Sequence, residues 1–520
     1  MRKLTTAVAG TFLGGTIAAS VSLAGPAASA GLGSDFNSDG WPDLAIGIPG
    51  DKVGGLANAG SVLIMYGSVQ DQGVSARRTQ VLHQNVAGVL DTAEAGDRFG
   101  TSVATGDFNG DGYHDLAVGI PGEDTNAGVD TGAFQTFMGS ASGLAPTNGL
   151  IDAGYSALPG ARMGTAMAAV DMLNSFTGND GPDGKTDVAV GAPGHDQSRG
   201  RVLILSGGYL ATNADGLELR SYDPDQAGAQ AGAALAGGNF DNTFGTGDEL
   251  AIGEPGFDIV GPPAVQDAGR VMVFYNANGD NPEFLFQSQS AIADDSEGGD
   301  RFGEVLETAD IDAVGSQDLV IGVPHEDIGS KADAGRVIVV LSSTDSGGGF
   351  ASPAGSYALD EGTAASAGDR FGASVGAADF GGTSAGTDLA VGVPGRTVSG
   401  KARAGRVMVW RSQNNILPAA AFKTFTQDTA NIGDIVEMGD EFGSTLHAAH
   451  LDAYVGADVI VGVPNEDIGS STNAGLVHFI YSLSDGFLTG TRSKVYRQGV
   501  GGIPGQPKSN EQFGTSLALH

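Results

Sequence analysis

The two ends of the chain are complementary halves of one repeating unit. The chain ends in EQFGTSLALH, and its first segment with a strand-like pattern is SDFNSDGWPDLAIGIPG. In the uninterrupted copy, FGTSVATGDFNGDGYHDLAVGIPG runs from Phe99 to Gly122. Residues 513–520 are as many as residues 99–106, so Asp35 would follow the C-terminus in register. The ends therefore predict a ring in which they complete one unit together.

Internal repeats set the number of units at seven. An apolar run of the DLAVGIPG type recurs every 62 to 72 residues, starting at Leu44, Leu116, Val188, Leu250, Leu319, Leu389 and Val459. Units of this length, made of short apolar runs between glycines, are typical of propeller blades. We expect an all-β fold: a seven-bladed β-propeller with four-stranded antiparallel blades, closed by pairing the C-terminal strand with the N-terminal blade.

Each unit has room for four strands. In the fifth unit, FGEVLETADI, DLVIGVP and AGRVIVVLSS are the expected first, second and third strands. Candidate fourth strands in other units are RTQVLHQ, EFLFQSQ and SKVYRQ, whose charged and amide side chains protect an exposed sheet edge. We expect the fourth strand to be the outermost one.

The first 30 residues have the features of an export signal. Arg2 and Lys3 precede an alanine-rich apolar stretch, and residues 28–30, Ala-Ser-Ala, have the small side chains of a cleavage site. We expect a signal peptide at 1–30, one propeller domain at 31–520, and a secreted, extracellular product. No apolar run after Ala30 approaches the roughly 18 residues that span a bilayer, so no membrane span is expected.

Charge and cysteine content narrow the expectations further. The chain has 61 Asp and Glu residues against 26 Lys and Arg, a formal net charge of -35. Nucleic acid is not an expected partner, because duplex binding requires a basic surface that displaces counterions. Cysteine is absent, so packing, ring closure and bound ions must supply the stability that disulfides give many exported proteins.

The repeated pattern FG…DxNxDGxxDLxxGxPG resembles the FG-GAP repeat and is similar to the blades of the integrin alpha-subunit propeller. An FG dipeptide starts at Phe99, Phe302, Phe371, Phe442 and Phe513, and Met163-Gly164 and Ala231-Gly232 stand at the other two positions. The resemblance covers essentially the whole mature chain. It implies a seven-bladed propeller with calcium in some loops between first and second strands. Integrin receptor signalling is not expected of a chain without the later integrin domains.

Two of these loops have a full set of calcium ligands. Calcium takes six to eight oxygen ligands, which alternate residues of a tight loop can supply when a glycine permits the turn. Gly40 and Gly112 stand at the turns. The expected metal ligands are the side chains of Asp35, Asn37, Asp39, Asp43, Asp107, Asn109, Asp111 and Asp115 and the backbone carbonyls of Trp41 and Tyr113.

The other five loops are degenerate copies. The third keeps Asn179, Asp183 and Asp187, which leaves a weak cation site open. The fifth keeps three aspartates but has Val314 where an oxygen ligand should be, and the seventh keeps only two aspartates. We expect structural turns in the loops that lack ligands, while the state of the third and fifth stays open.

The opposite face of the ring is expected to be acidic. It carries the loops between second and third strands and the turns between blades, with Glu123, Asp124, Glu326, Asp327, Glu466 and Asp467. Solvated turn-capping carboxylates are one interpretation of this face. A binding surface for an extracellular protein or a glycan is the other. The function we predict is a monomeric, secreted calcium-binding module for adhesion or ligand binding.

An enzyme is the alternative prediction. The GASVG segment around Ser374 matches a nucleophile-elbow pattern, but its copies in other units are GTSVATG and GTSLALH, which places it in a repeating strand. The histidines form no zinc-binding motif. The alternative is an extracellular carbohydrate-active enzyme, a lyase or hydrolase that uses carboxylates on the rim. No catalytic residue is singled out.

Overall fold

The structure is a computed structural model, and its described residues belong to one compact unit, Leu32–His520. These residues are 34–89, 91–152, 158–172, 183–212, 219–241, 247–261, 263–275, 282–289, 292, 294–314, 316–343, 349–350, 355–381, 386–454, 456–483 and 487–518. The predicted signal peptide lies outside them. No described helix combines the length and the apolar character that crossing a bilayer requires.

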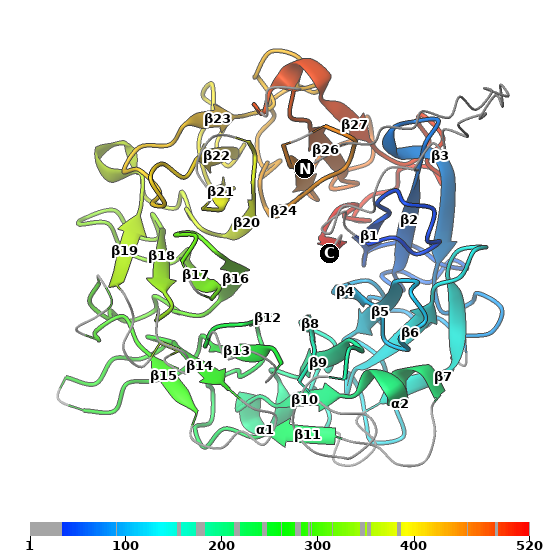
Figure 1. Cartoon of the computed structure of the whole chain (residues 1–520), viewed down its shortest axis with the longest axis horizontal. Coiled ribbons are helices and arrows are strands. Elements are labelled where there is room, and N and C mark those ends of the chain that lie inside the picture. The colour runs from blue at the N-terminus through cyan, green and yellow to red at the C-terminus, as the bar shows by residue number, and fades with distance from the viewer. Residues whose placement is uncertain are drawn as a thin grey trace, which may run out of the picture. The chain divides into compact units, whose positions relative to one another are not determined.

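Seven four-stranded antiparallel sheets stand around a central axis in the described part of the chain (Figure 1). The innermost strands of the sheets are short: β28 (Ser516–Ala518), β4 (Val103–Gly106), β8 (Met167–Val170), β12 (Leu235–Gly238), β16 (Val305–Ala309), β20 (Ser374–Ala378) and β24 (Thr445–Ala449). Each contacts the innermost strand of the next sheet, which makes the arrangement a ring. The predicted seven-bladed propeller is confirmed.

The second strands are buried along their whole length, as their apolar runs predict. They are β1 (Leu44–Ile48), β5 (Asp115–Ile120), β9 (Asp187–Gly191), β13 (Glu249–Glu254), β17 (Asp318–Val323), β21 (Asp388–Val393) and β25 (Asp458–Val463). The third strands are β2 (Ser61–Ser68), β6 (Ala133–Met138), β10 (Val202–Leu205), β14 (Arg270–Phe274), β18 (Arg336–Leu341), β22 (Arg406–Trp410) and β26 (Leu476–Ile480).

The fourth strands form the outer edges of the blades. They are β3 (Gly73–Leu82), β7 (Ala145–Asp152), β11 (Leu219–Tyr222), β15 (Glu283–Leu285), β19 (Gly355–Leu359), β23 (Lys423–Phe425) and β27 (Lys494–Tyr496). β3, β15 and β27 overlap the three segments predicted as outer strands. The described helices are short: α1 (His195–Ser198), α2 (Gly207–Thr212), η1 (Gly362–Ala364) and η2 (Gly490–Arg492).

The FG dipeptides connect neighbouring blades. The glycine before each third strand forms a parallel bridge with the first residue of the FG position in the next unit, as Gly60 does with Phe99. A Cβ on Gly60 would lie 2.2 Å from the carbonyl oxygen of Phe99, and the φ of Gly60 is +84°. Only glycine fits this close approach with that backbone conformation. The repeated AG and FG pairs are therefore one inter-blade contact.

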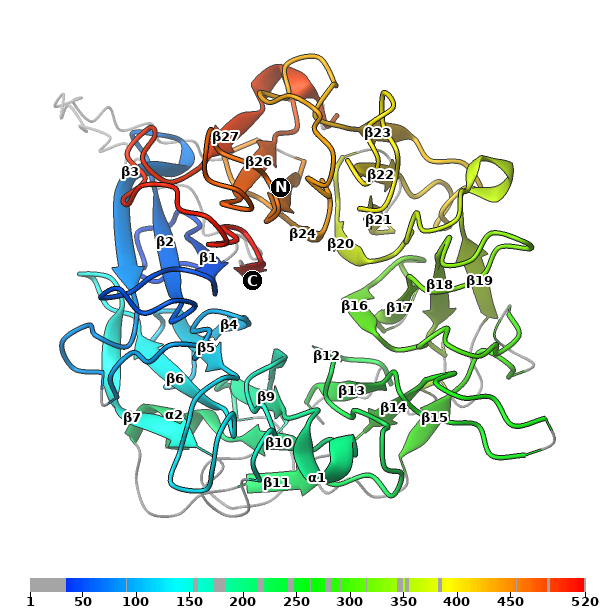
Figure 2. The ribbon, with the colours of Figure 1, turned by 180° about the vertical axis from the view of Figure 1, so that it is seen from behind.

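The C-terminal strand closes the ring as predicted. β28 pairs antiparallel with β1, and Leu517 lies opposite Ile46. Figures 1 and 2 both show the red C-terminal end beside the blue strand β1. Phe513 and Leu44 are fully buried in one apolar cluster, which also contains Phe479 of the seventh blade. The other six junctions between blades have apolar clusters of the same kind. The core is thus a circle of blade-to-blade contacts.

Candidate cation-binding loops

The last aspartate of the first loop bridges two parts of its blade. Asp43 begins the segment that leads into β1, and its side chain is fully buried. Its Oδ2 accepts hydrogen bonds from the amide of Phe36 at 2.9 Å and from Nδ2 of Asn37 at 3.2 Å. Its Oδ1 accepts one from the amide of Gly67, at the end of the third strand, at 2.8 Å. The carboxylate therefore ties the loop to the neighbouring strand end.

Six of the seven blades have this bridging aspartate in the described structure. Each one accepts an amide hydrogen bond from its own loop and another from the end of its third strand, at 2.7–3.0 Å: Asp43, Asp115, Asp187, Asp318, Asp388 and Asp458. In the fourth blade, Glu249 accepts hydrogen bonds from the loop amides of Phe240 and Asp241. The bridging aspartate is present whether or not the loop keeps other cation ligands.

Two amide hydrogen bonds leave a carboxylate with further acceptor capacity, because each of its oxygens has two lone pairs. Burial raises the pKa of Asp43 to about 8, and the charges of Asp35 and Asp39 raise it as well. Burial likewise raises the pKa of Asp115 to about 7, with Asp107 and Asp111 adding to the effect. Carboxylates that repel one another in this way are stabilised in their charged form by a cation.

The first loop is wound around its first aspartate. Asp35 accepts hydrogen bonds from the amides of Asp39 at 3.1 Å and Gly40 at 2.8 Å. Oδ1 of Asp39 accepts one from the amide of Trp41 at 3.1 Å. Gly40 has a φ of +83°, in the left-handed region that favours glycine. The predicted ligand residues therefore lie in one tight turn.

The second loop repeats this arrangement. Asp107 accepts from the amides of Gly110, Asp111 and Gly112 at 2.7, 3.1 and 2.9 Å. The side chain of Asn109 accepts from the amide of Asp111, and Asp111 accepts from that of Tyr113 at 3.0 Å. Asp, Asn and backbone oxygens are the hard ligands that calcium takes. The donor set of both loops fits that ion.

The fifth loop brings three carboxylates together. One oxygen from each of Asp310, Asp312 and Asp318 lies within 4.8 Å of the other two. Oδ1 of Asp310 is buried without a hydrogen-bond partner in the described structure. The amide of Val314 donates a hydrogen bond to Oδ1 of Asp312 at 2.9 Å. Val314 thus supplies no side-chain oxygen, as the sequence predicts, but the aspartates at the first, third and last positions of this loop lie close together all the same.

The third loop uses a residue that the sequence analysis missed. Asp171 accepts hydrogen bonds from the amides of Asp183 and Gly184, both at 3.1 Å, as Asp107 does from the amides of Asp111 and Gly112. Asp171 is therefore the first residue of this loop, and Asn179 lies outside the described residues. The signal was available, because Asp171 follows Met163-Gly164 at the same interval that separates Asp107 from its FG dipeptide.

An arginine occupies the seventh loop. The guanidinium of Arg492 pairs with the carboxylate of Asp452, which holds the third position of this loop, two residues after His450 at the first. Asp452 also accepts from the amide of Tyr454 at 2.9 Å. A basic side chain of the protein thus neutralises the charge of this degenerate loop.

The predicted acidic face is only partly exposed. Asp124, Asp327 and Asp467 are exposed, whereas Glu123, Glu326 and Glu466 are buried at 1%, 3% and 2%. Each buried glutamate accepts a hydrogen bond from a glutamine of the preceding blade: Glu123 from Gln84, Glu326 from Gln287 and Glu466 from Gln427. The expectation that all six residues form the surface is therefore wrong for these three.

Comparisons with known proteins agree with the repeat pattern. The model of the FG-GAP repeat matches residues 27–65 and 99–135. The phosphatidylinositol-glycan-specific phospholipase D of Bos taurus is 26% identical over 315 residues, which cover 57% of this chain and 35% of the relative. Integrin alpha-PS5 of Drosophila melanogaster is 33% identical over 32% of this chain and 16% of its own length.

A third relative, integrin alpha-5 of Xenopus laevis, is 41% identical over 92 residues, 18% of this chain and 8% of its own. The chain thus spans about a third or less of the length of these relatives. The similarity concerns the repeat and its fold.

Proposed function

Because the chain carries FG-GAP repeats in a propeller like that of integrin alpha subunits, we propose that it is a secreted calcium-binding module that binds an extracellular protein. The observation that carries this proposal is the complete ring, whose two faces are built from different loops. One face has the loops between first and second strands, and the other has the loops between second and third strands.

Calcium is proposed for the first two loops. Asp35, Asn37, Asp39 and Asp43 would hold it in the first, together with the carbonyl of Trp41. Asp107, Asn109, Asp111 and Asp115 would do so in the second, together with the carbonyl of Tyr113. What supports this proposal is the all-oxygen donor set in one tight turn and the raised pKa of Asp43 and Asp115. The bound ion would stabilise the folded ring by mass action.

The ligand is proposed to bind the opposite face. Glu94, Asp124, Glu297, Asp327 and Asp467 are exposed there, in turns between blades and loops after second strands. A surface with this charge favours a partner with a basic patch, and complementary charge increases the association rate. Secretion is proposed from the pattern of residues 1–30.

Binding of the purified full chain to an array of extracellular proteins and glycans tests the proposal. We expect calcium-dependent binding to proteins with basic patches, lost in a variant with Asp124, Asp327 and Asp467 changed to Lys. If the chain binds only glycans, the proposed protein ligand is wrong and the ligand is a carbohydrate. Absence of binding to every probe, in calcium and in chelator, would overturn the proposed function.

A further inference from the structure

The fourth blade departs from the repeat at one position after its second strand. In every blade this position comes two residues after a proline. It is polar or charged in six blades, as Asp51, Glu123, His195, Glu326, Arg396 and Glu466. In the fourth blade it is Phe257. A residue that breaks the rule of its repeat is a candidate for a function of its own.

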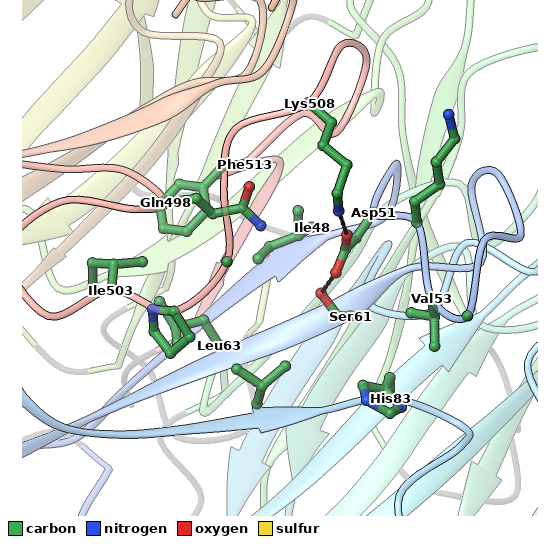
Figure 3. Close-up of a pocket in the computed structure, with 15 residues that line it drawn as sticks. Ile48, Asp51, Val53, Ser61, Leu63, His83, Gln498, Ile503, Lys508 and Phe513 are labelled. Atoms are coloured by element: carbon green, nitrogen blue, oxygen red, sulfur yellow. Dashed lines mark hydrogen bonds and ion pairs between the residues drawn. The ribbon is translucent and has the colours of Figure 1, made fainter.

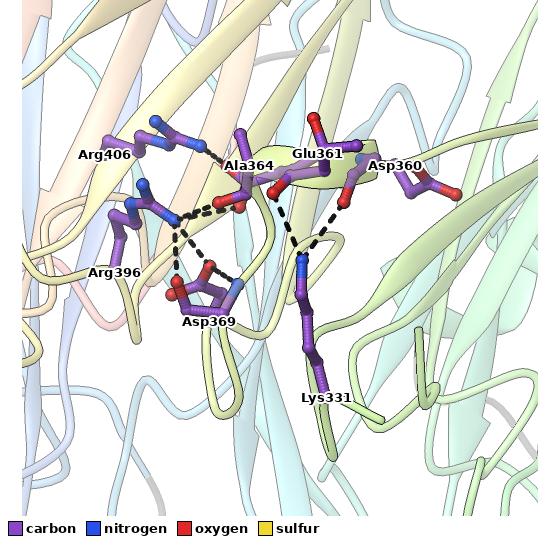
Figure 4. Close-up of polar contacts among 10 residues, drawn as sticks. Lys331, Asp360, Glu361, Ala364, Asp369, Arg396 and Arg406 are labelled. Carbon is purple, nitrogen blue, oxygen red and sulfur yellow. Dashed lines mark hydrogen bonds and ion pairs between the residues drawn. The ribbon is translucent and has the colours of Figure 1, made fainter. Parts of the chain in front are cut away.

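In the other blades this position makes polar contacts at a junction between blades. Glu123, Glu326 and Glu466 accept hydrogen bonds from glutamines of the preceding blades. In the sixth blade, Arg396 pairs at 2.8 Å with Asp369, which lies in the turn between blades 5 and 6 (Figure 4). The repeat therefore uses this position to join two blades through polar groups.

The ring-closing junction is of the same kind. One oxygen of Asp51 accepts a hydrogen bond from Oγ of Ser61 at 2.7 Å, and Nζ of Lys508 lies 3.3 Å from the other (Figure 3). These residues line a cavity together with Leu63 and Val81, which are opposite each other in β2 and β3. At its outer strand this cavity therefore has an aliphatic wall.

In the fourth blade two phenylalanines enclose an arginine. Cζ of Arg270, the first residue of β14, lies 3.8 Å from the ring centroid of Phe257 and 4.6 Å from that of Phe284 in β15. The residues at the position of Phe284 in the first, fifth, sixth and seventh blades are Val81, Ala358, Thr424 and Val495. Attraction between the guanidinium and the ring faces holds the three planar groups in place.

A buried glutamate fixes this arginine. Glu254 is the last residue of β13 and is fully buried, whereas β1, β5, β17, β21 and β25 end in isoleucine or valine. Its carboxylate pairs with Nε of Arg270 and accepts a hydrogen bond at 2.9 Å from the hydroxyl of Tyr222, in β11 of the third blade. A buried charge requires such partners. The unusual residues of blade 4 thus belong to one set of contacts.

The same residues line one cavity between blades 3 and 4. Its volume is about 510 Å³, and its wall contains Tyr222, Phe257, Arg270 and Phe284. The exposed residue Asp225 lines it as well. This volume lies within the range of about 300–1,000 Å³ that is typical of small-molecule sites. The residues that depart from the repeat therefore converge on a space that is large enough for a ligand.

The charges around this cavity disfavour an anionic ligand. Glu254 offsets the charge of Arg270, and Asp223 pairs with Nε of Arg201 at 2.5 Å. Asp225 adds an exposed carboxylate. A guanidinium has more N–H donors than the one that Glu254 uses, so Arg270 can also donate to a ligand. The cavity therefore suits an uncharged ligand that has both polar groups and an apolar side.

We propose that the cavity between blades 3 and 4 binds a neutral sugar residue. The C–H groups of a sugar ring pack against Tyr222, Phe257 and Phe284, while its hydroxyl groups accept hydrogen bonds from Arg270 and donate to Asp225. This inference goes beyond the proposed function, because none of the exposed acidic residues named for the protein ligand lines this cavity. The two ligands therefore have separate sites.

Saturation-transfer NMR of the full chain with methyl glycosides of glucose, galactose, mannose and N-acetylglucosamine tests the site. We expect at least one of them to bind. Phe257→Ala removes a ring of the cavity and is expected to abolish this binding. Phe422→Ala removes an exposed ring in the sixth blade, so it is the matched control and is expected to keep it. Binding of no glycoside, or unchanged binding by folded Phe257→Ala, would overturn the proposal.

Asp225→Ala decides if the Phe257→Ala protein does not fold, because Asp225 is exposed and its loss leaves the core intact. Loss of sugar binding then supports the site, and unchanged binding overturns it. Methyl glucuronide is the charged counterpart of methyl glucoside, and its tighter binding would contradict a neutral ligand.

A third variant separates the sugar site from the proposed protein ligand. The chain with Asp124, Asp327 and Asp467 changed to Lys is expected to lose its protein ligand and to keep the sugar. Loss of the sugar in this variant would contradict separate sites. A chain that binds a glycoside but no protein would overturn the proposed function and leave the sugar site standing.

Discussion

Gly475 forms a parallel bridge with Phe513, whose amide donates to the carbonyl oxygen of Ala474 at 3.0 Å. This is the same contact that Gly60 makes with Phe99, but here it joins the last blade to the strand that completes the first. The ring is therefore held at its closure by the contact that holds every other junction.

Removing the closing strand should open the ring. A chain that lacks residues 516–520 loses the pairing of β28 with β1 and exposes the edge of β1, so we expect a markedly lower melting temperature and aggregation. The control is a chain that lacks only residues 519–520, which lie outside the described structure. Thermal unfolding followed by circular dichroism measures both. Equal melting curves for the two chains would contradict closure by β28.

Calcium should stabilise the protein through the first two loops. Asp111→Ala removes one carboxylate from the second loop, so it should halve, roughly, the increase in melting temperature that calcium causes. Differential scanning fluorimetry with calcium and with chelator measures this increase. Asp295→Ala, at an exposed position, is the matched control and should keep the full response. An identical calcium response in wild type and Asp111→Ala would exclude the second loop as a site.

The bridging aspartate should stabilise the folded protein even when no calcium is bound. Asp388 accepts hydrogen bonds from the backbone amides of Phe380 and Ser412 at 2.9 and 2.7 Å. Asp388→Ala therefore leaves these two buried N–H groups without their acceptor. We expect a loss of about 2 to 5 kcal/mol in the free energy of unfolding, the same in calcium and in chelator. Asp115→Ala should lose stability and also calcium response. Urea denaturation measures both, and a calcium-dependent effect of Asp388→Ala would refute the distinction.

When calcium is removed by a chelator, the free energy of unfolding should decrease as the pH rises. Burial raises the pKa of Glu249 to about 8, whereas a glutamate in the unfolded chain titrates near about 4.3. Between these values the folded state holds a proton that the unfolded state has released, so its stability decreases as pH rises from about 4 to about 8.

Glu249→Gln should make this decrease smaller, while the exposed Glu297→Gln should not. Urea denaturation at several pH values in chelator measures both slopes. Parallel slopes for wild type and Glu249→Gln would show that Glu249 does not titrate in this range.

Much of the fold followed from the sequence, because a propeller repeats one set of contacts. The spacing from Phe513 to the end of the chain was enough to predict that β28 completes the first blade. Gly60 and Phe99 stood out as repeated residues, but their bridge joins different units. A repeat in the sequence does not show which copies are in contact in the fold. The bridge between Gly60 and Phe99 is therefore visible only in the structure.

The candidate sites were predicted less completely. The ligand spacing of Asp107 to Asp115 is local, and the structure keeps these residues in one turn. Glu466 is instead hydrogen-bonded to Gln427, which belongs to the preceding blade. The insertion before Asp183 hid the role of Asp171, because it separates Asp171 from Asp183 by more residues than lie between Asp107 and Asp111 in the intact loop. Contacts across a junction or an insertion have no fixed interval in the sequence.

The bridging aspartate holds the loop of a blade in place whether or not that loop has the ligands for a cation. Since Asp388 and Asp458 accept the same amide hydrogen bonds in loops that have lost other acidic positions, a blade keeps its loop when those positions change. Individual loops of such a ring are free to gain or shed an ion during evolution, one at a time, while the sevenfold frame is inherited unchanged.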